Sequence, residues 1–197
     1  NARFSIAPAY YTGSEVTPEV TVTHNGKTLV KDRDFTVTYH NNIEPSSYYN
    51  SPWVGIDGIG NYQGYVTKSF TINRADISSC TVTLSDESLT YTGSSLRPTA
   101  TVKSGDKELT LNQDYYVSYR NNWDAGTASA ILTGTGNYTG SVTKDFTIKP
   151  LDISRYSASL SQYSYTSDGT EKCPDVTVTY GDKTLAAGTD FTVSYKD

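Results

Sequence analysis

Residues that carry metal and nucleophilic chemistry are scarce in this chain. It contains no methionine and only two cysteines, two histidines and two tryptophans in 197 residues. Neither His24 nor His40 belongs to a His-x-x-x-His pair, and the sequence has no Cys-x-x-Cys pair and no Gly-x-Ser-x-Gly elbow. Because such patterns carry most metal and acyl-transfer sites, we expect no catalytic residues, no metal and no cofactor. The chain is therefore not expected to be an enzyme.

Charge and hydropathy exclude two classes of partner. The formal net charge is −5 at pH 7, whereas a nucleic-acid-binding face requires clustered Lys and Arg. No apolar run approaches the roughly 20 residues that cross a bilayer as a helix. We therefore expect no nucleic-acid partner and no membrane insertion in this part of the chain.

Hydroxyl-bearing and aromatic residues dominate what remains. The chain has 17 tyrosines, and Tyr, Thr and Val all favour the pleated surface of a β-sheet. Apolar and hydroxyl side chains alternate in residues 20–23 and 35–39, as in antiparallel strands with one buried face. Turn pairs such as Asn25-Gly26 and Gly105-Asp106 separate these segments. The pattern predicts an all-β fold.

An internal repeat is the strongest feature of the sequence. Gly60 corresponds to Gly136, and Asp114 corresponds to Asp190, so the period is 76 residues in both cases. The recurring segments are Tyr-Thr-Gly (11–13, 91–93), a proline before a strand (Pro18, Pro98, Pro174), Asp-aromatic-x-Val-x-Tyr (34–39, 114–119, 190–195), Asn-Asn (41–42, 121–122), Gly-x-Gly-Asn-Tyr-x-Gly (58–64, 134–140) and Phe-Thr-Ile (70–72, 146–148). A fixed period of this kind indicates a repeat architecture.

These motifs divide the chain into repeat 1 (residues 1–73), repeat 2 (residues 74–150) and a partial repeat 3 (residues 151–197). Roughly six or seven short strands in each complete copy, with turns between them, predict tandem small immunoglobulin-like β-sandwiches. A β-grasp-like unit is the alternative. The linkers between copies are only a few residues long, which favours an elongated string over freely tumbling domains.

The combined motifs resemble the immunoglobulin-like tandem repeats of large surface proteins from Gram-positive, Clostridia-type bacteria. The resemblance covers essentially the whole chain. It implies a non-catalytic repeat region that acts as a stalk or spacer of a bacterial cell-surface protein. It also implies an extracellular location, at the cell surface or in the cell wall, with the export signal and anchor outside this fragment.

Residues that recur in the copies are expected to be structural. Tyrosines at equivalent positions should pack in the core and direct their hydroxyls to backbone partners. Asp34, Asp114 and Asp190 should cap nearby backbone N–H groups. The segments Gly58–Gly64 and Gly134–Gly140 are interpreted as turns, since their glycine spacing differs from that of a dinucleotide-binding loop.

The residues that break the repeat are the candidates for binding. Repeat 1 has 17 residues between Asn42 and Gly60, whereas repeat 2 has 13 between Asn122 and Gly136. The insertion brings Tyr48, Tyr49 and Trp53, and the same loop of repeat 2 carries Trp123. Aromatic side chains on loops are good anchors for sugars and proteins. The alternative function is therefore an adhesin or carbohydrate-binding module, with a glycan or a host or matrix protein as partner.

Repeat 3 and the two cysteines lead to two further expectations. The sequence of repeat 3 stops before the Asn-Asn and Gly-x-Gly-Asn-Tyr segments, and an incomplete unit leaves strand edges that promote association. The incomplete repeat 3 therefore predicts self-association of this chain. Cys80 and Cys173 belong to different copies and occupy non-equivalent positions, so we expect them to be unpaired.

Overall fold

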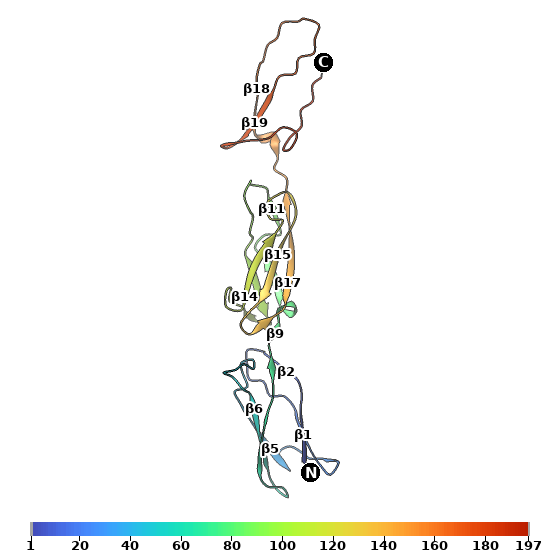
Figure 1. Cartoon of the computed structure of the whole chain (residues 1–197), viewed down its shortest axis with the longest axis vertical. Helices are drawn as coiled ribbons and strands as arrows, with labels where there is room; N and C mark the ends of the chain where they lie inside the picture. The colour runs from blue at the N-terminus through green and yellow to red at the C-terminus, as the bar shows by residue number, and fades with distance from the viewer. Residues whose placement is uncertain (1, 197) are drawn as a thin grey trace. The chain divides into compact units, whose positions relative to one another are not determined.

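The computed structural model describes residues 2–196 and is divided into two compact units, Asn1–Lys149 and Pro150–Asp197 (Figure 1). The described residues form several small β-sheets and no α-helix. The only helical segments among them are two single 3-10 turns, η1 (Ile77–Ser79) and η2 (Ile153–Arg155). The prediction of an all-β fold is confirmed.

Repeat 1 folds into two three-stranded sheets and one short ribbon. Its strands are β1 (Ala2–Ile6), β2 (Ala9–Tyr10), β3 (Val20–His24), β4 (Lys27–Thr28), β5 (Phe35–His40), β6 (Trp53–Gly58), β7 (Tyr65–Ser69) and β8 (Ile72–Asn73). The sheets have the orders β1-β3-β4 and β5-β6-β7, and all their neighbours are antiparallel. β2 pairs with β8 in parallel.

Repeat 2 follows the same plan, but its strands β15 and β17 are longer than their counterparts in repeat 1. It contains β9 (Ala75–Asp76), β10 (Thr81–Leu84), β11 (Ser88–Thr90), β12 (Ala100–Ser104), β13 (Lys107–Glu108), β14 (Tyr115–Arg120), β15 (Gly126–Gly134), β16 (Tyr138–Thr139) and β17 (Ser141–Lys149). One sheet has the order β10-β12-β13 and the other β11-β17-β15-β14. β11 runs parallel to β17, as β2 does to β8.

The cores explain the alternating pattern of the strands. In repeat 1 the buried cluster combines Val22 of β3 with Phe35 of β5 and with Val54 and Ile56 of β6, so both sheets contribute to it. In repeat 2 the larger cluster likewise combines Val102 of β12 with residues of β14 and β15. The alternate residues of these strands are mostly hydroxyl-bearing and face outward, which is how a period of two buries one side of a strand.

The recurring aspartates and three of the recurring tyrosines make the predicted backbone hydrogen bonds, whereas Tyr165 is 41% exposed and does not pack as predicted. Tyr39 donates its hydroxyl proton to the carbonyl of Pro18 at 2.6 Å, and Tyr119 does the same to Pro98 at 2.6 Å. Tyr195 donates in the same way to Pro174 in the second unit. A carboxylate oxygen accepts a backbone N–H four residues earlier in all three copies, at Asp34 (2.9 Å), Asp114 (2.8 Å) and Asp190 (2.8 Å).

The second unit contains one small sheet. Its strands are β18 (Ser157–Leu160), β19 (Val176–Tyr180) and β20 (Lys183–Thr184), arranged in the order β18-β19-β20. Val178 is its one buried hydrophobic residue among those described, while Ile153 and Leu160 are exposed. Cys80 and Cys173 are free thiols, as expected.

Candidate functional site

The inserted segment of repeat 1 forms a loop that presents two tyrosines to solvent. Tyr48 and Tyr49 are each 94% exposed, and their rings meet edge to face with centroids 5.0 Å apart. Exposed aromatic rings of this size have apolar faces that remain hydrated and are available to a partner. The structure thus brings two of the four predicted binding residues together.

Hydrogen bonds within the loop fix the conformation of the backbone that carries this tyrosine pair. The side-chain amide of Asn50 donates to the carbonyls of Glu44 at 2.7 Å and Pro45 at 3.2 Å. The Ser47 hydroxyl accepts the backbone N–H groups of Tyr49 and Asn50. A loop closed by such contacts presents its tip at a smaller entropic cost than a free loop would.

Trp53 lies apart from the tyrosine pair. It is the first residue of β6, where its register partner is His40, and the two rings stack at 3.8 Å with an interplanar angle of 13°. The sequence pattern placed Trp53 in the loop, but the pairing of β6 with β5 already begins at Trp53, directly after the buried Pro52. Its side chain is only partly exposed as a result.

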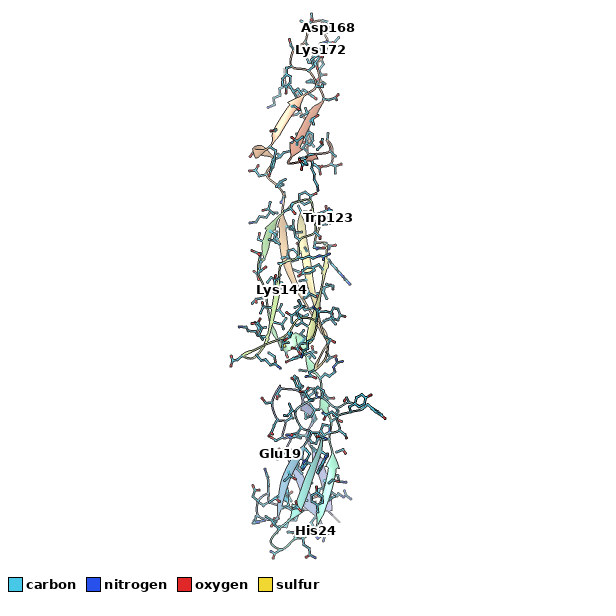
Figure 2. The ribbon with its side chains drawn as sticks, turned by 90° about the vertical axis from the view of Figure 1, so that its left-hand side faces the viewer. Glu19, His24, Trp123, Lys144, Asp168 and Lys172 are labelled. Carbon is cyan, nitrogen blue, oxygen red and sulfur yellow. The ribbon has the colours of Figure 1, made fainter. Side chains whose placement is uncertain are left out.

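Trp123 belongs to repeat 2 and is 53% exposed. Figure 2 shows Trp123 at the end of repeat 2 that lies away from repeat 1. The loop of repeat 1 lies at the other end of repeat 2, because Glu44 of this loop contacts Asn137 there. Trp123 and the Tyr48–Tyr49 pair therefore do not form one site.

The first unit also contains a built contact between repeats 1 and 2, which we call the joint. Its centre is an edge-to-face pair of Tyr11 from repeat 1 and Tyr138 from repeat 2, with ring centroids 5.7 Å apart and an interplanar angle of 89°. The two tyrosines are only 7% and 1% exposed, and both belong to the buried cluster of repeat 2. Burial raises the pKa of Tyr138. The hydrophobic core thus continues from one repeat into the next.

Lys107 of repeat 2 covers the edge of this tyrosine pair. Its Nζ lies 3.4 Å from the Tyr11 hydroxyl oxygen and 5.7 Å from the centroid of the same ring. Donation to the Tyr11 hydroxyl stabilises the ammonium form and raises the pKa of Lys107. A cation held over a tyrosine ring adds a modest attraction.

Polar contacts surround the joint. The Asn137 amide donates to Oε2 of Glu44 at 2.7 Å, and Nε of Arg74 donates to the carbonyl of Gly136 at 2.7 Å. The linker itself pairs with repeat 2, since β9 runs parallel to β16 with Ala75 opposite Tyr138. The linker, the inserted loop of repeat 1 and the Gly134–Gly140 turn of repeat 2 therefore all meet at the joint.

An open groove of about 520 Å³ lies beside the joint. Tyr10, which is 59% exposed, forms one wall, and Ser46 of the inserted loop and Arg74 of the linker contribute polar groups. Thr139 of repeat 2 completes it. An exposed ring beside amide, hydroxyl and guanidinium donors has the chemistry of a site for a polar ligand such as a sugar.

The described residues contain no group of three or more His, Cys, Asp or Glu side chains that could hold a metal ion. Within residues 2–196 no helix is long and apolar enough to cross a membrane. Comparisons with protein-family models, with curated proteins and with solved structures find no match to this chain.

The joint residues were not predicted as a site. Tyr11, Asn137 and Tyr138 belong to recurring motifs, so the sequence indicated packing inside one copy. Glu44 was part of the insertion, but the aromatic residues beside it were the stronger signal. No signal in the sequence placed the insertion beside the linker, because β7 and β8 lie between residues 43–53 and Arg74.

Proposed function

We propose that this chain is a non-catalytic spacer in an extracellular bacterial surface protein, located at the cell surface or in the cell wall. The joint is the observation that carries this proposal. A buried tyrosine pair, a lysine and the hydrogen bond from Asn137 to Glu44 connect repeats 1 and 2, so their ends are held at one separation. Nearest-neighbour contacts of this kind give a repeat protein its reach.

The finer architecture is part of the same proposal. Each complete repeat is an immunoglobulin-like sandwich, which is supported by the buried clusters that draw residues from two sheets. Repeat 3 exposes Ile153, Leu160 and Tyr165, which supports its association with further β-structure. Sedimentation of the chain over a range of concentrations tests whether that association joins two copies.

A distance measurement across the joint tests the spacer function. Spin labels at Lys27→Cys and Ser94→Cys, in a background of Cys80→Ala and Cys173→Ser, report the separation of two exposed positions in repeats 1 and 2. A spacer requires a narrow distance distribution. The variant Tyr11→Ala should broaden it, and a broad distribution in the parent chain would contradict the proposal.

The second candidate function is adhesion through the inserted loop, with a glycan or a matrix protein as partner. The 94% exposure of both Tyr48 and Tyr49 on a hydrogen-bonded loop favours it. The test is binding of the whole chain to a panel of glycans and matrix proteins. Tyr49→Ala should abolish a specific signal, whereas Tyr116→Ala, which removes an exposed strand tyrosine of repeat 2, should retain it. Absence of binding across the panel would remove this candidate.

A further inference from the structure

The groove beside the joint is the outward face of the strands whose inward face builds the joint core. Side chains alternate along β2, β8 and β16, so Ala9, Ile72 and Tyr138 are buried in one cluster. The residue that follows each of them is exposed and lines the groove: Tyr10, Asn73 and Thr139. β2 and β9 lie at this junction of repeats 1 and 2 (Figure 1). A ligand in the groove therefore contacts both repeats.

The inserted loop forms one wall of the groove. The Ser46 N–H donates to the Ile72 carbonyl at 2.9 Å, and the Ile72 N–H donates to the Ser46 hydroxyl at 3.0 Å. These two bonds fasten the loop to β8 just before the Tyr48–Tyr49 pair. The wall is specific to repeat 1, because repeat 2 lacks the insertion.

Two further groove residues depart from the repeat. Strand pairing aligns Tyr10 with Thr90, because their partners on the last strand are 76 positions apart. The 76-residue period aligns Arg74 with Pro150. Residues that the fold requires recur in both copies, whereas this exposed ring and this guanidinium occur at one junction. Packing within a repeat therefore does not account for them.

Arg74 is the one charged side chain in the lining of the groove. Its Nε donates to the Gly136 carbonyl at 2.7 Å, which fixes the plane of the guanidinium. Within the described part of the chain Arg74 forms no ion pair, so its two Nη groups remain for a ligand. A guanidinium presents parallel N–H groups that match the two oxygens of a carboxylate. The groove thus favours an anionic group.

Apolar surface in the groove is limited to one aromatic ring. Tyr10 is 59% exposed, whereas Ile72, the one aliphatic residue of the lining, is 1% exposed. The lining also includes the hydroxyls of Ser46, Thr71 and Thr139. A lipid chain or an apolar peptide needs apolar pockets, whereas a sugar presents a C–H face to a ring and hydroxyls around its edge. The lining therefore suits a sugar.

We infer that the groove binds a saccharide that carries a carboxylate, a uronic acid. Arg74 pairs with the carboxylate, the Tyr10 ring packs against the face of the sugar, and hydroxyl groups of both repeats bind its hydroxyls. Because Thr139 belongs to repeat 2 and Thr71 to repeat 1, the ligand bridges the joint. This inference deepens the adhesion candidate and rests on it, since it names the class of glycan and adds contacts at the joint to those of the loop.

Matched acidic and neutral sugars test the groove in the whole chain. The probes are hexasaccharides of galacturonic, glucuronic and mannuronic acid, each as the free acid and as its methyl ester. Calorimetry should show binding of at least one acid and binding of its ester that is weaker by about tenfold, because the ester loses the charge-assisted pairing. The amide resonances of Thr71 and Thr139 should both shift during the titration.

Three variants locate the contact. Arg74→Gln should weaken binding of the acid by about tenfold, to the level of the ester. Tyr10→Thr should weaken binding of both probes, and the fold tolerates threonine at the equivalent position, Thr90. The control Arg120→Gln removes the exposed last residue of β14 and should bind as the parent chain does.

Equal affinity for acid and ester, unchanged affinity in Arg74→Gln, or no binding of any of the three acids would overturn the inference. Binding that is lost in Tyr49→Ala but unchanged in Tyr10→Thr and Arg74→Gln would also overturn it, while leaving adhesion through the inserted loop intact. Failure of the groove and failure of the adhesion candidate are therefore distinguishable.

Discussion

Repeats 1 and 2 share a sequence pattern and a strand register, yet they complete their cores differently. In repeat 2 the last strand, β17, runs for nine residues, and Ile77 and Tyr138 close the end of the core. In repeat 1 the same stretch is divided into β7 and β8, and Phe70 between them donates its N–H to the carbonyl of Pro52. Strand register therefore follows from the local pattern, whereas the core of repeat 2 is closed by its own Ile77 and Tyr138 together with Tyr11 and Ile72 of repeat 1.

The largest effect expected from this difference is a core truncation in the closed repeat. Leu132 and Ile56 hold equivalent positions, but Leu132 is fully buried in its cluster, whereas Ile56 lines an open cleft of about 220 Å³ in repeat 1. We expect Leu132→Ala to lower the free energy of unfolding by about 3 kcal/mol. Ile56→Ala should cost less, because part of the space that it leaves is already open to water. Residue-resolved hydrogen exchange measures each repeat separately, and equal losses would remove the distinction between closed and open cores.

A feature that both repeats share should give equal effects. Tyr39→Phe and Tyr119→Phe each remove one hydroxyl that donates to a proline carbonyl at 2.6 Å. Each change should cost about 1 kcal/mol, the net value of a typical hydrogen bond, plus any penalty for the carbonyl left without its partner. Urea unfolding of the two variants measures this. A loss in only one repeat would mean that the tyrosine contact is not a common element of the fold.

The features that lie within one copy could be predicted from the sequence. Alternation predicted the strands, and recurrence predicted the contacts of Tyr39 and Asp34. The joint could not be predicted. Its partners Tyr11 and Tyr138 are 127 positions apart along the chain, and each belongs to a recurring motif, which indicated packing within its own copy. For the candidate site, the pattern indicated Tyr48 and Tyr49 but could not separate Trp53, whose strand pairing decides its exposure.

A smaller difference between the repeats concerns how their stability depends on pH in the acid range. Arg33 donates to the carboxylate of Asp34 and, with the Val30 N–H, lowers the pKa of Asp34 to about 2; repeat 2 has Gln113 at the place of Arg33. Because this pKa is lower in the folded state than in the unfolded state, where it is about 4, the carboxylate stabilises repeat 1 above about pH 4. The contribution is lost as the pH falls toward 2.

The variant Arg33→Gln tests that difference. It should raise the pKa of Asp34 toward its ordinary value, so that repeat 1 is less stable at neutral pH and its stability changes less between pH 4 and pH 2. Urea unfolding at several pH values measures the slope. The reverse change, Gln113→Arg, adds the same pairing to repeat 2 and serves as the matched gain. An unchanged slope in Arg33→Gln would mean that the Val30 N–H alone holds the carboxylate.

The smallest expected effect belongs to the one side-chain hydrogen bond by which the inserted loop reaches repeat 2. Asn137 donates to Glu44 at 2.7 Å, but Glu44 is exposed, so water competes for the contact. A double-mutant cycle of Glu44→Ala and Asn137→Ala should give a coupling of about 0.5 kcal/mol. If the loop orients the joint, the distance distribution across the joint should nevertheless broaden in Glu44→Ala, because a second contact beside the Tyr11–Tyr138 pair restricts rotation about that pair. A measurable coupling with an unchanged distribution would instead assign the orientation of the repeats to the tyrosines and the β9–β16 pairing alone, and would leave the insertion free for a role in binding.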